Sequence, residues 1–152
     1  MESLVSIVMP VFNTEDFLAD SIMGILHQDY SRWELLLILD GGQEVANAYD
    51  WKRRFPDSRI RWLISKRNRG LSRSRNLAMR CAKGSWIAFC DSDDVWRPNK
   101  LTIQLQIAQR GNYNILGSCF AFSQKRMGVG SGNMALEYLK RSVLPRKLDY
   151  QT

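Results

Sequence analysis

The sequence has no long apolar run. No stretch of the 152-residue chain approaches the roughly 20 consecutive apolar residues that a membrane-spanning helix needs. The first apolar segment has no basic residue before it and is interrupted at Pro10, which argues against a secretory signal peptide. We therefore expect a cytoplasmic protein that is soluble or peripheral at the inner face of the membrane.

Cysteine and histidine are also scarce. The three cysteines, Cys81, Cys90 and Cys119, are widely and irregularly spaced, which argues against a disulfide framework or a zinc site and fits a reducing compartment. Cys90 and Cys119 stand in apolar runs, so we expect them to be small buried hydrophobes. His27 is the single histidine, and we interpret it as structural rather than catalytic.

Internal repeats and a disordered composition are absent as well. The apolar fraction of 45% and the charged fraction of 24% are those of an ordinary globular protein, and the length suits one domain better than two. We therefore predict a single domain over residues 1–152, with the recognisable motifs in 4–110 and weaker signals in 111–152.

Strand and helix signals alternate along the chain, which predicts an α/β fold with a mostly parallel sheet flanked by helices. The predicted strands span residues 4–9, 34–39, 59–64, 86–90 and 114–122. The predicted helices span residues 15–27, 43–55, 71–82, 98–110 and 134–141. In this interpretation Pro10 closes the first strand, Gly84 ends the third helix, and Pro98 opens the fourth helix.

Three polar segments directly follow predicted strands. They are Pro10-Val11-Phe12-Asn13, Asp40-Gly41-Gly42 and Asp91-Ser92-Asp93-Asp94. Ligands of open α/β sheets bind beyond the carboxyl ends of the strands, so a parallel sheet would gather all three segments along one edge. Polar residues follow buried strands in any α/β protein, but the coincidence of three such segments favours a binding site.

The third segment contains three carboxylates, Asp91, Asp93 and Asp94, within four positions. Carboxylates this close repel one another unless a cation lies among them, and Mg²⁺ and Mn²⁺ prefer such oxygen ligands. The sequence therefore suggests a divalent metal at Asp91 and Asp93, placed to bridge to a diphosphate. The simpler alternative is that one acid caps the helix near Pro98 while the others are solvated, although three carboxylates exceed what a cap requires.

Basic residues concentrate in residues 51–84. They are Lys52, Arg53, Arg54, Arg59, Arg61, Lys66, Arg67, Arg69, Arg73, Arg75, Arg80 and Lys83. Asp57 is the only acid there, so the segment favours phosphates, nucleic acid or an anionic membrane as partners, with a solvated basic surface as the simpler alternative. Arg69, Arg73 and Arg75 flank a predicted helix start, where backbone N–H groups also favour anions. Because the nearby acids would repel a nucleic-acid backbone, a phosphate-bearing ligand with its metal suits the pattern better.

Four motifs together resemble family 2 glycosyltransferases, whose fold is the GT-A (Rossmann-like) fold. Residues 5–13 (VSIVMPVFN) are similar to the family's opening strand and its loop of Pro, a small residue, Tyr or Phe, and Asn. Residues 33–41 (WELLLILDG) resemble the second strand with its Asp-Asp-Gly-Ser ending, and residues 68–76 (NRGLSRSRN) resemble the Asn-x-Gly-x-Ser-x-Ala-Arg-Asn segment. Residues 87–96 (IAFCDSDDVW) resemble the metal-binding Asp-x-Asp region. The motifs occur in the family's order, so together they are a specific signal.

The resemblance implies a site for a nucleotide-sugar, most simply a UDP-sugar. The nucleotide-binding residues that it implies are Pro10, Phe12, Asn13, Asp40, Asn68, Arg75, Asp91 and Ser92. Among them, Asp40 matches the acid that reads the uracil ring, and Asp91 matches the acid near the ribose and sugar. Asp93 matches the direct ligand of a Mn²⁺ or Mg²⁺ ion that would stabilise the departing diphosphate.

The sequence departs from the family pattern in two respects. Leu39 stands where the family often has a first acid, and Gly42 replaces the usual Ser, which weakens the inference of base recognition. Family members also use a carboxylate base, well downstream of the Asp-x-Asp region, to deprotonate the acceptor. We therefore expect the chain to be truncated before its acceptor-binding part and the base to lie beyond Thr152, so no catalytic base is named.

The expected function is that of a metal-dependent hexosyltransferase, or a fragment of one, that transfers a sugar with inversion to a glycan or lipid-linked acceptor. The alternative is a non-catalytic nucleotide-binding or partner-docking module derived from the same family. We expect no nucleic-acid partner. Apolar surface left uncovered at the end of the sheet would promote self-association, so we also expect homo-oligomers, and the basic segment allows peripheral association with a membrane.

Overall fold

The computed structural model describes residues 3–117 of the chain. Its elements in chain order are β1 (Val5–Val11), α1 (Glu15–Leu26), β2 (Trp33–Asp40), α2 (Gln43–Ala46), α3 (Ala48–Arg54), β3 (Ile60–Ser65), α4 (Leu71–Cys81), β4 (Trp86–Phe89) and α5 (Lys100–Gly111). The internal contacts divide the chain into two units, Met1–Leu105 and Gln106–Thr152. The first unit holds the four strands and α1 to α4.

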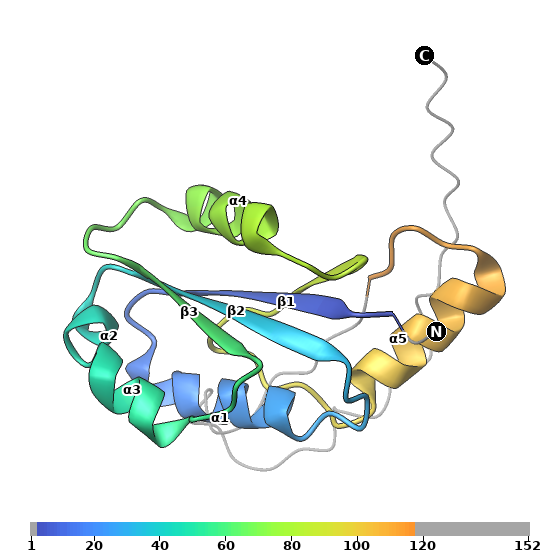
Figure 1. Cartoon of the computed structure of the whole chain (residues 1–152), viewed down its shortest axis with the longest axis horizontal. Helices are drawn as coiled ribbons and strands as arrows, with labels where there is room; N and C mark the ends of the chain where they lie inside the picture. Colours follow the sequence, from blue (N-terminus) through green and yellow to red (C-terminus); the bar gives the residue numbers. More distant parts are fainter. Residues whose placement is uncertain (1–2, 118–152) are drawn as a thin grey trace, which may run out of the picture. The chain divides into compact units, whose positions relative to one another are not determined.

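The four strands form one parallel sheet in the order β3-β2-β1-β4. Every residue of β1 and β2, the two central strands, is buried, as expected of strands that are covered on both faces. The helices α1, α2 and α3 lie on one face of the sheet, and α4 lies on the other (Figure 1). The predicted α/β fold with a parallel sheet flanked by helices is therefore confirmed.

The core divides into two parts because successive side chains of a strand point to opposite faces of the sheet. The part on the side of α1 includes Ile7, Met9, Leu35, Leu37, Leu18, Ile22 and Ile25. The part on the side of α4 includes Val8, Leu36, Ile38 and Ala78. These side chains hold the strands in register, so the carboxyl ends of the strands are fixed relative to one another.

Pro10 does not close the first strand, contrary to expectation. It is paired with Ile38 inside β1, which continues to Val11. The N–H of Cys90 donates to the carbonyl of Val8, so the backbone polar groups of Val8 point toward β4. Every second residue of a strand points the same way, so the nitrogen of Pro10 also faces the β4 side, where β4 has already ended at Phe89. A residue without an N–H is tolerated at this place because no ladder hydrogen bond is lost there.

Two helices also differ from the prediction. The single helix expected over 43–55 is divided into α2 and α3 at Asn47, whose dihedrals are φ −93° and ψ 13°; asparagine is a poor helix former. Pro98 does not open α5, which begins at Lys100. The carbonyl of Pro98 instead accepts a hydrogen bond from the N–H of Asp29, at 2.8 Å.

Gly84 has a different role from the helix end that we predicted for it. A β-carbon at this position would lie 2.6 Å from the carbonyl oxygen of Leu4 and 2.6 Å from the nitrogen of Ser6. Glycine is therefore required here for the close approach of two backbones, where the chain leaving α4 meets the start of β1.

The weaker C-terminal predictions are only partly tested. Residues 114–117 contain no strand, which contradicts the first part of the strand expected over 114–122. The remainder of that strand and the helix expected over 134–141 lie outside the described residues. Within residues 3–117, no helix is long and apolar enough to cross a membrane.

Candidate functional site

The three polar segments that follow strands are placed along one edge of the sheet. Asp40 ends β2, Phe12 and Asn13 follow β1, and Asp91 follows β4 after one residue. Because these strands are parallel neighbours, their carboxyl ends meet at the same edge (Figure 1). The topology therefore brings together the segments that the sequence singled out, at the place where open α/β sheets bind ligands.

The carboxylate of Asp40 binds the turn that precedes α4. Asp40 is 3% exposed, and its two oxygens accept hydrogen bonds from the N–H groups of Arg69, at 2.9 Å, and Gly70, at 3.0 Å. The side-chain oxygen of Asn68 accepts a further bond from the N–H of Gly70, at 2.8 Å. A carboxylate has about four lone-pair positions, so Asp40 fixes this turn and still has acceptor capacity for a ligand.

Gly41 makes the approach of this turn possible. A β-carbon on Gly41 would lie 2.8 Å from the backbone nitrogen of Asn68, and its φ of +82° is strained for any other residue. The motif-bearing turn at 68–70 therefore sits directly against the end of β2.

Arg75 connects α4 to the acidic segment after β4. One of its terminal guanidinium nitrogens lies 2.7 Å from a carboxylate oxygen of Asp91, and the guanidinium carbon lies 5.5 Å from the centre of the Phe89 ring. The Nε atom of Arg75 is buried and has no hydrogen-bond partner. The side chain of Asp91 is 53% exposed, so this ion pair orients two charged groups at the edge of the sheet but adds little stability.

Ser92 faces the interior rather than solvent. Its side-chain oxygen accepts a hydrogen bond from the hydroxyl of Thr14, at 2.9 Å, and its carbonyl accepts one from the hydroxyl of Ser21, at 2.9 Å. These contacts fasten the loop after β4 to the first two turns of α1. In this structure Ser92 thus anchors the acidic segment, while Asp91 and Asp94 are exposed and Asp93 is partly exposed.

The loop after β1 presents an aromatic ring at the same edge. Phe12 is 43% exposed, whereas Pro10 is buried within the strand. Asn13 has a φ of +54°, a conformation that asparagine tolerates better than most residues. The Phe12 ring is therefore available to a planar ligand at the edge where Asp40 ends β2.

Two further carboxylates, Glu15 and Glu44, were not identified as site residues from the sequence. Glu44 is 0% exposed; one of its oxygens accepts from the N–H of Thr14 at 2.6 Å, and the other is buried without a partner. Burial, followed by the charges of Glu44 and Asp16, raises the pKa of Glu15. Glu15 and Glu44 each fall in the first turn of a helix, where acids are common, so no sequence signal distinguished them.

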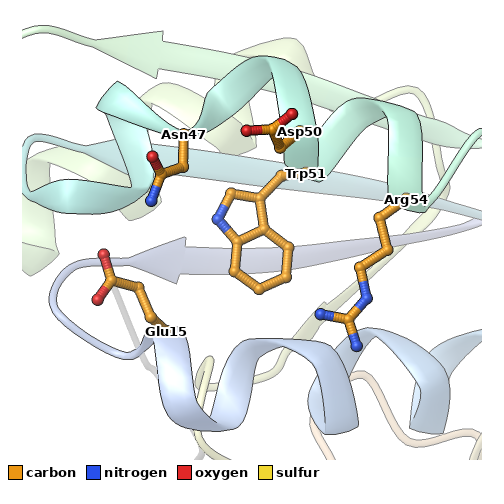
Figure 2. A pocket seen from close by; sticks show the side chains of 5 residues that line it. All are labelled: Glu15, Asn47, Asp50, Trp51 and Arg54. Carbon is orange, nitrogen blue, oxygen red and sulfur yellow. The ribbon is translucent and has the colours of Figure 1, made fainter.

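A hollow of about 370 Å³ lies between α1 and α3, and Glu15 at the start of α1 is one of the residues that line it. Figure 2 shows Trp51 and Arg54 reaching from α3 toward α1, with Glu15 and Asn47 beside the indole nitrogen. None of the residues predicted from the motifs lines it. We regard the strand ends as the candidate site because an open edge can bind a ligand without forming an enclosed cavity, and because the polar groups converge there.

Cys90, next to the acidic segment, is a buried free thiol. Burial, and then the charges of Asp94 and Asp91, raise its pKa far above the ordinary value. The thiol therefore stays protonated and acts as a small core residue, as predicted.

Comparison with known proteins places the chain in a family. A sequence model of glycosyl transferase family 2 matches residues 6–150. The chain is 34% identical over 147 residues to an Escherichia coli protein named UDP-Glc:alpha-D-GlcNAc-diphosphoundecaprenol beta-1,3-glucosyltransferase WfgD, a match that covers 97% of this chain and 53% of that protein. The chain thus spans about half the length of this relative.

Two solved structures resemble the fold. S. aureus TarS in complex with UDP-GlcNAc matches with a TM-score of 0.64 and 20% identity, over 72% of this chain and 32% of that one. The mannosyltransferase PcManGT from Pyrobaculum calidifontis, in complex with GDP-Man and Mn²⁺, matches with a TM-score of 0.59 and 21% identity, over 68% of this chain and 31% of that one. At these identities the likeness shows a shared fold, and that fold is the predicted GT-A class.

Proposed function

Since the chain belongs to glycosyl transferase family 2, we propose that it binds a nucleotide-diphosphate sugar at the carboxyl edge of its sheet. The sugar would be transferred to a glycan or lipid-linked acceptor. A UDP-sugar is the simplest donor, because the name of the E. coli relative specifies UDP-Glc and a diphosphoundecaprenol-linked acceptor. The observation that carries the proposal is the convergence of Asp40, the 68–70 turn and the Arg75–Asp91 pair at one edge.

Asp40 and Phe12 have the chemistry that recognition of a base requires. The carboxylate of Asp40 is held in place by two backbone N–H groups and can accept another hydrogen bond from an N–H of the base. The exposed Phe12 ring offers a flat apolar surface on which a base can stack. We propose that Pro10, Asn13 and Asn68 shape the border of this pocket.

The acidic segment fits a metal that arrives together with the donor. No group of three His, Cys, Asp or Glu side chains that could hold a metal gathers within residues 3–117. Mg²⁺ is usually bound through one or two carboxylates plus substrate phosphates rather than by a cage of protein ligands, and Asp91 and Asp93 can supply that number. The resident groups therefore suit a Mn²⁺ or Mg²⁺ ion, which when bound acts as a Lewis acid on the diphosphate.

In the proposed transfer, the bond between the sugar C1 and the diphosphate oxygen breaks as the acceptor hydroxyl oxygen bonds to C1. The hydroxyl proton must pass to a base, and the described geometry assigns that role to no residue within 3–117. Negative charge develops on the leaving diphosphate, so cationic groups at this edge favour the transition state. Arg75 supplies one such charge, and it also orients Asp91.

Calorimetric titration of UDP into the full chain, with Mn²⁺ and with EDTA, tests the proposal. We expect binding that requires Mn²⁺ and that weakens by about two orders of magnitude in Asp93→Ala, because loss of even an outer-shell partner of a metal ligand costs about 10–100-fold in metal affinity. Asp20→Ala, which removes an exposed acid on α1, is the matched control and should bind as the wild type does. Folded protein that binds no UDP in either condition would refute the donor site. Binding that is equal with EDTA and in Asp93→Ala would refute the metal's role.

A further inference from the structure

The outer face of α4 carries a positive charge that is not neutralised within the described residues. No acid occurs between Asp57 and Asp91. Of the basic residues in that interval, Arg59 pairs with Asp57, Arg61 with Glu34 and Arg75 with Asp91. The others are exposed and belong to none of the ion pairs found within residues 3–117: Lys66, Arg67, Arg69, Arg73, Arg80 and Lys83.

The spacing of these residues explains why they face outward. Arg73, Leu77 and Arg80 are four and three positions apart, so they share one face of the helix, whereas Ser74 and Ala78 are buried against the sheet. Leu77 is 37% exposed. Among α1 to α4, α4 alone lies on its face of the sheet (Figure 1). We name the set of Lys66, Arg67, Arg73, Leu77, Arg80 and Lys83 the α4 surface.

We propose that the α4 surface docks on a membrane that contains anionic phospholipids. Clustered Lys and Arg side chains are attracted to the negative surface of such a membrane. An exposed apolar side chain among them, here Leu77, enters the boundary between headgroups and acyl chains. A surface for single-stranded nucleic acid would instead be expected to interleave its cations with aromatic rings on which bases stack, and the α4 surface contains no aromatic residue.

The α4 surface adjoins the candidate donor site, so membrane docking would bring that site to a lipid-linked acceptor; this step rests on the proposed function. α4 begins directly after Gly70, whose N–H binds Asp40 at the candidate donor site. A membrane against α4 would therefore lie beside the edge of the sheet at which we place the donor. A lipid-linked acceptor, held in that membrane, would be presented close to the sugar without having to leave the bilayer.

Co-sedimentation with vesicles of phosphatidylcholine, with and without phosphatidylglycerol, tests the proposal. The full chain should bind only the vesicles that contain the anionic lipid. Arg80→Gln combined with Lys83→Gln should weaken binding about 30-fold, since each cation at an anionic membrane contributes about fivefold. The matched control combines Lys52→Gln with Arg53→Gln, which removes the same charge from α3 on the opposite face of the sheet (Figure 1), and should have little effect.

Two further measurements separate the alternatives. Leu77→Gln should weaken vesicle binding and leave binding to heparin, a soluble polyanion, unchanged. The proposal is overturned if the wild type does not bind anionic vesicles, if both double variants weaken binding equally, or if Leu77→Gln has no effect on vesicle binding. Calorimetry with UDP distinguishes failure of the membrane proposal from failure of the donor site. Arg80 and Lys83 lie outside the proposed donor-binding residues, so their double variant should bind UDP as the wild type does.

Discussion

Glu34 is expected to be one of the most costly acids of the chain to remove, although it lies far from the candidate donor site. It is 6% exposed, and its carboxylate accepts hydrogen bonds from the hydroxyl of Ser6 at 2.6 Å, the N–H of Lys83 at 2.6 Å and the guanidinium of Arg61 at 2.8 Å. The hydroxyl of Ser6 in turn accepts from the N–H of Gly84, at 2.8 Å. One carboxylate therefore ties β1, β2 and β3 to the segment that leads from α4 into β4.

The expected cost of Glu34→Ala follows from the donors that lose their acceptor. The hydroxyl of Ser6 and the N–H of Lys83 would be left unsatisfied, at about 1–3 kcal/mol each. Arg61 is 34% exposed at its side chain and keeps its bond to the carbonyl of Cys81, so it adds little. We expect a loss of about 3 kcal/mol in the free energy of unfolding, and about half as much for Glu34→Gln, which keeps one acceptor oxygen.

The pH dependence gives an independent check. Burial raises the pKa of the Glu34 carboxyl. The hydrogen bonds from Ser6, Arg61 and Lys83 and the charge of Arg61 lower it, and together they outweigh burial, so the pKa lies below its ordinary value of 4.5. A group whose pKa is lowered in the folded state stabilises the fold above its unfolded pKa, and this contribution is lost as the pH falls through the folded pKa. The stability difference between the wild type and Glu34→Gln should therefore be full above about pH 4.5 and should shrink below it.

Urea unfolding, followed by circular dichroism across this pH range, measures both effects. Asp20→Ala serves as the control because Asp20 is exposed, and surface substitutions usually change stability by less than about 0.5 kcal/mol. If Glu34→Ala is no more destabilising than Asp20→Ala, the hydrogen-bond network does not contribute in the way that we have argued. A difference between the wild type and Glu34→Gln that is independent of pH would refute the assignment of the lowered pKa.

Two shorter predictions concern the packing. Gly84→Ala should lower the free energy of unfolding by about 2–4 kcal/mol, because the added β-carbon meets backbone atoms that cannot move aside. Gly117→Ala is the control, because no atom lies within 4 Å of its new β-carbon. Equal urea midpoints for the two variants would contradict this prediction. In a variant with Cys81→Ala and Cys119→Ala, the buried Cys90 thiol should react with a thiol reagent at pH 8 only after urea unfolds the chain, since its raised pKa and burial suppress the thiolate. Rapid labelling of the folded variant would refute this prediction.

Elements with a strong periodic signal could be predicted from the sequence. The continuous apolar runs of β1 and β2 indicated strands buried on both faces, and the alternation of strands with helices indicated a parallel sheet. The boundaries were less predictable because they depend on partners elsewhere in the chain. Pro10 remains in β1 only because the neighbouring strand β4 has ended beside it, and Asn47 divides a predicted helix that would otherwise continue.

The sequence motifs predicted which segments make up the candidate site, but they did not predict the hydrogen bonds between those segments. The topology explains why Asp40 and Asp91 lie at the same edge, since Asp40 ends β2 and Asp91 follows β4, and both strands run parallel to β1, which lies between them. The bonds from Asp40 to the N–H groups at 69 and 70 could not be inferred, because they depend on how the loop after β3 folds back. The same holds for Ser92, whose hydrogen bonds to Thr14 and Ser21 give it an anchoring position within the acidic segment.

The two positions that depart from the family pattern are explained by their surroundings. Leu39 is 0% exposed and belongs to the core on the side of α1, so its side chain does not point to the same face as that of Asp40, the next residue along the strand. Gly42 has a φ of +76°, and a β-carbon there would lie 2.6 Å from an oxygen of Glu44 and 2.8 Å from the side-chain oxygen of Asn13. In this chain a leucine and a glycine thus satisfy local packing and backbone constraints, whereas Asp40, the acid that faces the 68–70 turn, is retained. The departures therefore do not by themselves argue against recognition of a base by Asp40.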